Sequence, residues 1–185
     1  SLPDWLYDRL VAEYAEREAV AFGRAMLKPA PLDLRVNTML GNREEILEEL
    51  RASGFAAEPT PWSPVAIRLA GKPVINRHPT FMRGAVEVQD EGSPLLGYLV
   101  APKRREMIVD FCAGAGGKTL MIGALMQSTG RLYAIDVSEK RLNNLKPRLK
   151  RSGLSNVYPP LIQGENDIKV KRLAGKIDRV LVDAP

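Results

Sequence analysis

Residues 107–119 read Met-Ile-Val-Asp-Phe-Cys-Ala-Gly-Ala-Gly-Gly-Lys-Thr, an apolar run followed by a glycine-rich turn. A short apolar run is typical of a buried strand, and glycine lets the backbone turn sharply and approach a ligand closely. Ligands of open α/β sheets bind at the carboxyl ends of the strands, where a following helix presents free N–H groups. The stretch therefore predicts a site for a nucleotide-like ligand.

The residues after this turn alternate between helical and strand-like patterns. We predict a helix to about residue 127, a strand over 132–135, a basic helix over 138–151, a strand near 157–162 and a strand over 180–182. Strands that alternate with helices are typical of a parallel sheet covered by helices. The sequence therefore predicts an α/β fold with a doubly wound parallel sheet.

The residues before the turn follow a different order. The patterns predict a helix over 5–25, a strand over 32–37, a helix from Asn42 to Gly54, strands around 65–69 and 85–88, and a helix that begins at Ser93. Glu45 follows Asn42 by three residues, as a capping box requires. This order is typical of a small α+β lobe, and many RNA-binding modules have a similar size.

The polar run Lys103–Arg105 predicts the domain boundary. We expect residues 1–105 to hold the first helix and the small α+β lobe, a candidate RNA-binding lobe. We expect residues 106–185 to hold the first part of the sheet domain. A chain of 185 residues can bury a sizeable core, and this length allows two small domains.

Composition narrows the class of protein. The chain is 45% hydrophobic and 26% charged, with no apolar run long enough to span a membrane. Its acidic, amphipathic start resembles neither a secretory signal nor a transit peptide. Cys112 is the only cysteine, so no internal disulfide can form, and there is no His/Cys cluster typical of a metal site. We expect a soluble, cytoplasmic, monomeric protein without a metal.

The positive charge is unevenly distributed. The net charge of +5 arises entirely in residues 106–185, whereas residues 1–105 are balanced. Within the balanced part, Pro59 to Val86 contains no acid and carries Arg68, Lys72, Arg77 and Arg83. Such surfaces suit a polyanion because each neutralised phosphate releases counterions. A solvated basic face would give the same pattern, so both interpretations stay open.

One interpretation of the turn is a nucleoside triphosphatase. Gly117-Lys118-Thr119 resembles a phosphate cradle, and Val180-Leu181-Val182-Asp183 resembles a strand that ends in a magnesium-positioning acid. The cradle requires a further glycine separated from the Gly-Lys pair by four residues. That position is Cys112, whose Cβ would occupy the place of bare backbone. The match fails there.

The other interpretation is an S-adenosylmethionine site. Asp136 ends the second predicted strand 20 residues after Gly116, the spacing at which an acid meets a ribose diol. The sulfonium and amino groups of this cofactor would give Asp110 and Asp183 an electrostatic role. Alternatively, Asp136 only caps the helix that begins near Ser138.

Four motifs together resemble one family, the Sun/Fmu/Nop group of S-adenosylmethionine-dependent RNA cytosine carbon-5 methyltransferases. They are residues 34–37 (Leu-Arg-Val-Asn), 88–93 (Val-Gln-Asp-Glu-Gly-Ser), the turn at 110–119 and residues 178–185 (Asp-Arg-Val-Leu-Val-Asp-Ala-Pro). The resemblance covers nearly the whole chain and implies a Rossmann-like class I methyltransferase domain. The family turn usually reads Cys-Ala-Ala-Pro-Gly-Gly-Lys, where this chain has Gly114-Ala115-Gly116 in the middle.

The resemblance also implies a role for each residue of the site. The turn would wrap the methionine moiety of the cofactor through Cys112, Ala113, Gly114, Ala115, Gly116, Gly117 and Lys118. Asp136 would bind the ribose hydroxyls with Arg141 nearby. Asp167 would approach the adenine, with Glu165 as a competing assignment, and Asp183 would lie at the methyl-transfer end.

The chemistry of the family requires two cysteines. One thiolate adds to carbon 6 of cytosine and makes carbon 5 nucleophilic, and the second assists product release. In the family one cysteine directly follows Asp-Ala-Pro, whereas this chain ends at Pro185, and the resemblance places Cys112 in the cofactor turn. We therefore expect a C-terminally truncated chain that is inactive alone, in which Asp183 is a supporting catalytic residue.

The implied partner is RNA, with ribosomal RNA favoured over transfer RNA. A non-enzymatic RNA-binding protein on the same fold is the alternative. Trp5 and Trp62 could stack on bases, although core packing or a wall contact is favoured. His78 fits a surface loop better than a catalytic base because it has no evident partner. The basic side chains within 140–151 could contact phosphates or simply face solvent.

Overall fold

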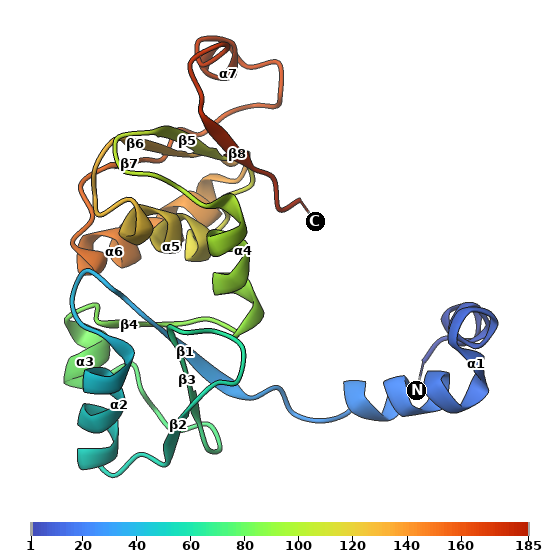
Figure 1. The fold of residues 1–185 in the computed structure, drawn as a ribbon. Coiled ribbons are helices and arrows are strands. Elements are labelled where there is room, and N and C mark those ends of the chain that lie inside the picture. Colours follow the sequence, from blue (N-terminus) through green and yellow to red (C-terminus); the bar gives the residue numbers. More distant parts are fainter. Residues whose placement is uncertain (1, 185) are drawn as a thin grey trace. The chain divides into compact units, whose positions relative to one another are not determined.

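The computed structural model describes residues 2–184, and the chain divides into two units, residues 1–31 and residues 32–185. The first unit is α1 (Asp4–Met26), which Figure 1 draws as two helical pieces. The break is at Ala15, whose φ of 67° lies in the left-handed region. Leu2 approaches within 3.2 Å of the position a Cβ would take on Gly23, which a straight helix of this length would prevent. The prediction of one continuous helix over 5–25 is therefore wrong.

The second unit begins with an antiparallel sheet of strand order β2-β3-β1-β4 and two helices. Its elements are β1 (Leu32–Val36), α2 (Arg43–Ala52), β2 (Ala57–Pro59), β3 (Ala66–Leu69), α3 (Pro79–Met82) and β4 (Val86–Val88). Apolar side chains from the sheet and from α2 form one core, with Leu34, Leu50 and Ile67 fully buried. This confirms the predicted α+β lobe. The two elements that the sequence did not predict, β2 and α3, have three and four residues.

The start of α2 confirms the predicted capping box. The Asn42 side chain accepts from the Glu45 N–H at 2.9 Å, and the Glu45 carboxylate accepts from the Asn42 N–H at 3.3 Å. The helix is followed by Gly54, whose φ of 86° suits a glycine after a helix end.

The rest of the unit is an open parallel sheet of strand order β7-β6-β5-β8, as predicted. Its elements are α4 (Gly92–Val100), β5 (Met107–Asp110), α5 (Gly117–Leu125), β6 (Arg131–Ala134), α6 (Glu139–Ser152), β7 (Val157–Tyr158), α7 (Ile168–Lys171) and β8 (Arg179–Leu181). One core joins α5 and α6 to the sheet, and a smaller cluster includes Val170 of α7. The strand order reverses direction between β5 and β8, which is where open α/β sheets bind ligands.

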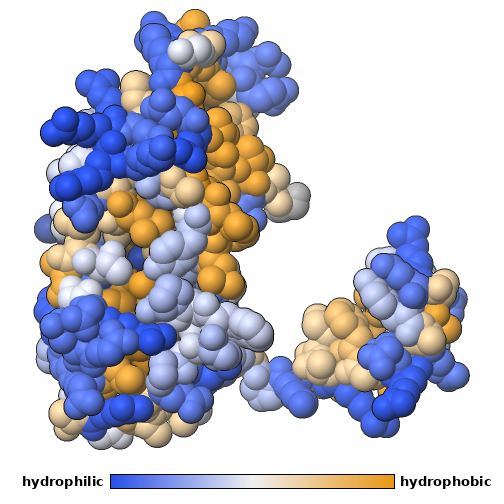
Figure 2. All heavy atoms as spheres, in the orientation of Figure 1, coloured by the Kyte–Doolittle hydropathy of each residue, from blue (hydrophilic) through white to orange (hydrophobic). Residues whose placement is uncertain are grey.

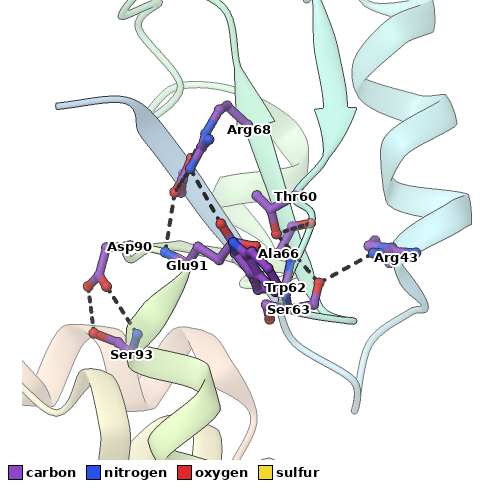
Figure 3. Close-up of polar contacts among 10 residues, drawn as sticks. Arg43, Thr60, Trp62, Ser63, Ala66, Arg68, Asp90, Glu91 and Ser93 are labelled. Atoms are coloured by element: carbon purple, nitrogen blue, oxygen red, sulfur yellow. Dashed lines mark hydrogen bonds and ion pairs between the residues drawn. The ribbon is translucent and has the colours of Figure 1, made fainter. Parts of the chain in front are cut away.

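The beginning of α4 differs from its prediction. The helix starts at Gly92, and its N-cap residue Glu91 makes no side-chain cap bond. Asp90 takes that role instead, because its carboxylate accepts from the Ser93 N–H at 3.0 Å and from the Ser93 hydroxyl at 2.5 Å, as Figure 3 shows. Ser93 is thus a donor inside the first turn and not the cap.

Helix α4 packs closely on α5, since a Cβ on Gly97 would lie 2.6 Å from Cγ of Met121. Figure 2 shows apolar side chains gathered over the region where α4 and β8 lie in Figure 1. Leu99, Val180 and Val182 are exposed there. None of the helices within residues 2–184 combines the length and apolar content that a membrane span requires.

Candidate functional site

The glycine-rich turn joins the carboxyl end of β5 to the first residue of α5. Gly114 and Gly116 have φ values of 57° and 82°, which L side chains rarely adopt. A Cβ on Gly116 would lie 2.1 Å from Cδ1 of Leu145, so α6 packs directly on the turn. Glycine at position 116 is therefore required by both the backbone angle and the packing.

The turn lines a cavity of about 230 Å³ at the switch point of the sheet. Its walls are Gln89, Asp110, Cys112, Ala113, Gly114, Ala115, Gly117, Lys118 and Asp183. The fold thus brings together the ends of β5 and β8, the turn, and Gln89 just after β4 of the α+β lobe. Gln89 belongs to one of the motifs of the resemblance, but nothing in the sequence places it at the turn, and we did not predict a role for it.

Asp136 is buried and ties the turn to the end of β6. One carboxylate oxygen accepts from the Gly114 N–H at 2.8 Å, and the other accepts from the Ser138 N–H at 2.7 Å. A carboxylate has about four acceptor positions, so roughly two remain for a ligand. The cap of α6 is the Ser138 side chain, which accepts from the Arg141 N–H at 3.4 Å. The interpretation of Asp136 as merely a helix cap is therefore wrong.

Asp110 and Asp183 supply negative charge on one side of the cavity. Asp110 is 1% exposed and accepts from the Thr119 hydroxyl at 2.6 Å. Burial raises the pKa of its carboxyl to about 6, although Thr119 and Lys118 oppose the shift. Asp183 forms an ion pair of 2.6 Å with Lys118. The positive charge of Lys118 is therefore paired with acidic side chains of the protein itself.

The thiol of Cys112 lies among these acids. Burial raises its pKa, and the charges of Asp136, Asp110 and Asp183 raise it further. The thiolate is the nucleophilic form of cysteine, and this environment disfavours it. The structure thus gives Cys112 no activation as a nucleophile.

A second hollow, of about 800 Å³, lies next to Val137, the residue after Asp136. Asp167 lines this hollow, and Glu165 does not. The Asp167 carboxylate accepts from the Lys169 N–H at 2.8 Å and the Gln163 N–H at 3.0 Å, and these bonds hold its pKa below the usual value. Of the two competing acids, Asp167 has the position from which a ligand could be reached. The Arg141 side chain is exposed on the first turn of α6.

Three further residues with predictions lie outside the turn, namely Trp5, Trp62 and His78. Trp5 and Trp62 are 63% and 77% exposed, so core packing, one of the two favoured interpretations, is wrong for both. The loop that carries Trp62 is held by Glu91, whose carboxylate accepts from the Trp62 and Ser63 N–H groups at 2.5 and 3.1 Å. Figure 3 shows these three residues close together. His78 caps α3 by accepting from the Thr80 N–H at 3.3 Å. The His78 side chain is half-buried, and this hydrogen bond gives it a structural role at the start of α3.

The acid-free stretch, residues 59–86, has less unpaired positive charge in the folded structure than its sequence suggests. Arg68 forms two bonds to Asp33, at 2.7 and 2.8 Å, and Arg83 pairs with Glu49 at 2.5 Å. Both acids come from other elements, so half of the basic side chains counted in this stretch are neutralised. Within the described residues, no group of three His, Cys, Asp or Glu side chains is arranged to hold a metal ion.

Comparison with known proteins gives consistent matches over nearly the whole chain. Residues 2–76 match a family model described as the RsmF/B-like methyltransferase, ferredoxin-like domain, and residues 97–185 match the model for 16S rRNA methyltransferase RsmB/F. The chain is 31% identical to the probable ribosomal RNA small subunit methyltransferase B of Bacillus subtilis, over 100% of this chain and 41% of that protein. It is 32% identical to the human 28S rRNA (cytosine(4447)-C(5))-methyltransferase, over 100% of this chain and 23% of that protein.

A methyltransferase homolog protein from Pyrococcus horikoshii has a similar solved structure. It is 31% identical, with a TM-score of 0.88 over 100% of this chain and 60% of that one. The chain spans less than half the length of these two curated relatives. The similarity therefore concerns a part of each of them.

Proposed function

The chain belongs to the Sun/Fmu/Nop family of S-adenosylmethionine-dependent RNA cytosine carbon-5 methyltransferases, and from this we propose that it forms part of an enzyme that methylates carbon 5 of a cytosine in ribosomal RNA. The observation that carries the proposal is the joining of the glycine-rich turn to Asp136 by the Gly114 N–H. This bond holds the turn and the end of β6 together, which supports a single adenosine site formed by both.

The residues present fit S-adenosylmethionine. Asp136 accepts from the N–H of Gly114, which lines the smaller cavity, and it directly precedes Val137, which lines the larger hollow. A cofactor whose ribose hydroxyls donate to Asp136 would extend its methionine into the cavity and its adenine into the hollow, where Asp167 lies. Arg141, on the first turn of α6, would lie near the ribose.

The walls of the cavity fit the methionine end. Backbone groups of residues 112–118 would surround the amino acid moiety, because the glycines leave the backbone bare. The carboxylates of Asp110 and Asp183 would stabilise its positive charges, and Asp183 would lie beside the target base. The cofactor supplies the methyl group, and these residues bind and orient it.

The nucleophile that attacks cytosine comes from outside these 185 residues in this proposal. Cys112 is the only cysteine, and its raised pKa leaves it protonated at neutral pH. We infer that these residues provide the cofactor site and part of the RNA surface, and that a thiolate from elsewhere forms the bond to carbon 6.

RNA is the proposed partner of the α+β lobe. Trp62 offers an exposed aromatic face at a loop fixed by Glu91, two residues after Gln89 of the cavity wall. A base next to the target could stack there. The exposed side chains of Lys140, Lys146 and Lys150 on α6 could contact phosphates. We propose that the protein acts as a cytoplasmic monomer without a metal.

Calorimetric titration with S-adenosylmethionine tests the site. We expect wild type to bind and Asp136→Ala to lose at least about 30-fold in affinity, because a charge-assisted pair of ligand bonds disappears along with the support of Gly114. Glu48→Ala in α2 is the matched control, since it removes an exposed carboxylate that lines neither cavity, and it should bind like wild type. Equal affinity of Asp136→Ala and wild type would refute the proposal.

A further inference from the structure

A buried carboxylate of the α+β lobe is paired with two arginines of α6. Glu87 on β4 is 4% exposed. Its carboxylate accepts from Nε of Arg148 at 2.9 Å and also pairs with Arg151. An ionised group buried to this extent is stable only when it is paired, so this contact fixes where α6 lies against the lobe.

Only one of the two arginines also reaches the glycine-rich turn. Nη1 of Arg148 donates to the Ala115 carbonyl at 2.8 Å. Nη2 of the same guanidinium is 3.9 Å from the place of a Cβ on Gly117. Because a guanidinium is planar and rigid, its position on Glu87 determines its position on the turn. Arg151 instead places its guanidinium over the Phe81 ring, at 4.3 Å from the centroid.

Gln89, the residue that follows β4, also lies close to the turn. The Gln89 amide oxygen accepts from Nε of Arg35 at 2.6 Å, and its nitrogen is 3.1 Å from the place of a Cβ on Gly117. Arg35 is 1% exposed. Burial lowers its pKa to about 10, and Glu87 opposes the shift, so it is charged at neutral pH. Glu87 and Gln89 are alternate residues of one segment, and both connect the lobe to the turn.

We propose that Arg148 is a positioning residue for the cofactor, through which Glu87 of the α+β lobe holds the Ala115 carbonyl and so the shape of the turn. The turn carries two left-handed glycines and therefore has little intrinsic rigidity. Position 115 is alanine, where proline would fix the backbone by itself. The hydrogen bond from Arg148 restrains this residue from outside. The inference rests on the proposed function, because it assigns Arg148 a role in binding S-adenosylmethionine.

The experiment compares Arg148→Met with Arg151→Met in the 185-residue chain. Both changes remove one guanidinium from Glu87, and both should lower the free energy of unfolding in urea. Only Arg148→Met frees the Ala115 carbonyl. We expect it to weaken S-adenosylmethionine binding at least about 10-fold, while Arg151→Met stays within about 2-fold of wild type in calorimetry. A merely structural role would lower stability in both variants without separating their affinities.

Equal affinities of the two variants would overturn the proposal. If Arg148→Met does not fold, the same comparison uses Arg148→Lys and Arg151→Lys. These variants keep the positive charge but lack the planar guanidinium, which can donate to two acceptors at once. Only Arg148→Lys should then lose affinity, at least about 5-fold, and equal affinities would again overturn the proposal. Failure of wild type to bind the cofactor would instead refute the proposed function, so the two failures are distinguishable.

Discussion

At the scale of single residues, the three acids of the candidate site differ in their hydrogen-bond and ion-pair partners. Asp136 accepts two backbone N–H bonds, Asp183 is paired with Lys118, and Asp110 is buried with one hydroxyl donor. The pKa of Asp110 is raised to about 6 because burial outweighs its favourable partners. Ionisation of Asp110 thus lowers the free energy of unfolding. Such a loss of stability is expected for a charged group that binds a ligand.

Asp110→Asn tests this cost. Because the folded-state pKa is raised, the stability linked to Asp110 is full below the unfolded value near 4 and declines as the pH rises through about 6. Asparagine can still accept from Thr119 but carries no charge. We expect Asp110→Asn to be more stable than wild type at pH 7.5, by roughly 1 to 3 kcal/mol, and equal to it near pH 4. Urea unfolding at both pH values measures this.

The same variant separates stability from binding. Loss of the negative charge near the sulfonium should weaken S-adenosylmethionine binding by roughly 3- to 10-fold at pH 7.5. A variant that is less stable than wild type at pH 7.5 would contradict the assigned pKa. Unchanged affinity would show that Asp110 has no electrostatic role toward the cofactor.

At the scale of elements, the sequence predicted most of the helices and strands that follow residue 31. The capping box at Asn42 and the alternation of strands and helices after residue 106 depend on neighbours in sequence, which a pattern can show. The break at Ala15 could not be predicted, because no proline or glycine marks it. Strand β2 was missed because three residues are too few to show a period.

The candidate site was predictable only in part. The turn and Asp136 stand out by glycine content and spacing, and the structure places them in contact. Arg148 and Gln89 were not predicted because their contacts are 33 and 54 residues away, at Ala115 and Arg35. The sequence assigned Asp167 to the adenine but left Glu165 as a competing assignment, and of the two only Asp167 lines the hollow beside Val137.

Gly116→Ala tests how α6 is packed on the turn. The new Cβ would meet Leu145 at 2.1 Å and would force alanine into a φ of 82°. We expect destabilisation of roughly 2 to 4 kcal/mol, with loss of cofactor binding. Gly54→Ala is the matched control, because its φ is 86° with nothing within 4 Å, so it reports backbone strain alone. Equal destabilisation of the two variants would contradict the packing argument.

At the scale of the whole molecule, buried contacts join the α+β lobe to the sheet domain within residues 32–185. The Asn37 amide donates to the Gly84 carbonyl at 3.1 Å and to the Ser152 carbonyl at 3.0 Å. A Cβ on Gly84 would lie 2.0 Å from the Arg151 carbonyl oxygen. The lobe therefore contacts α6 directly, and this is the path by which we propose that it influences the site. The domain boundary near residue 105 stays a prediction.

The most direct test of the account is a nuclear magnetic resonance titration that follows backbone amide signals. We predict that S-adenosylmethionine shifts the signals of Gly114, Gly117 and Val137 together, since one ligand would span the turn and the end of β6. ATP with magnesium should leave these signals unchanged. Shifts confined to one side of Asp136, or shifts produced by ATP and not by S-adenosylmethionine, would contradict the claim that these two parts form one adenosine site.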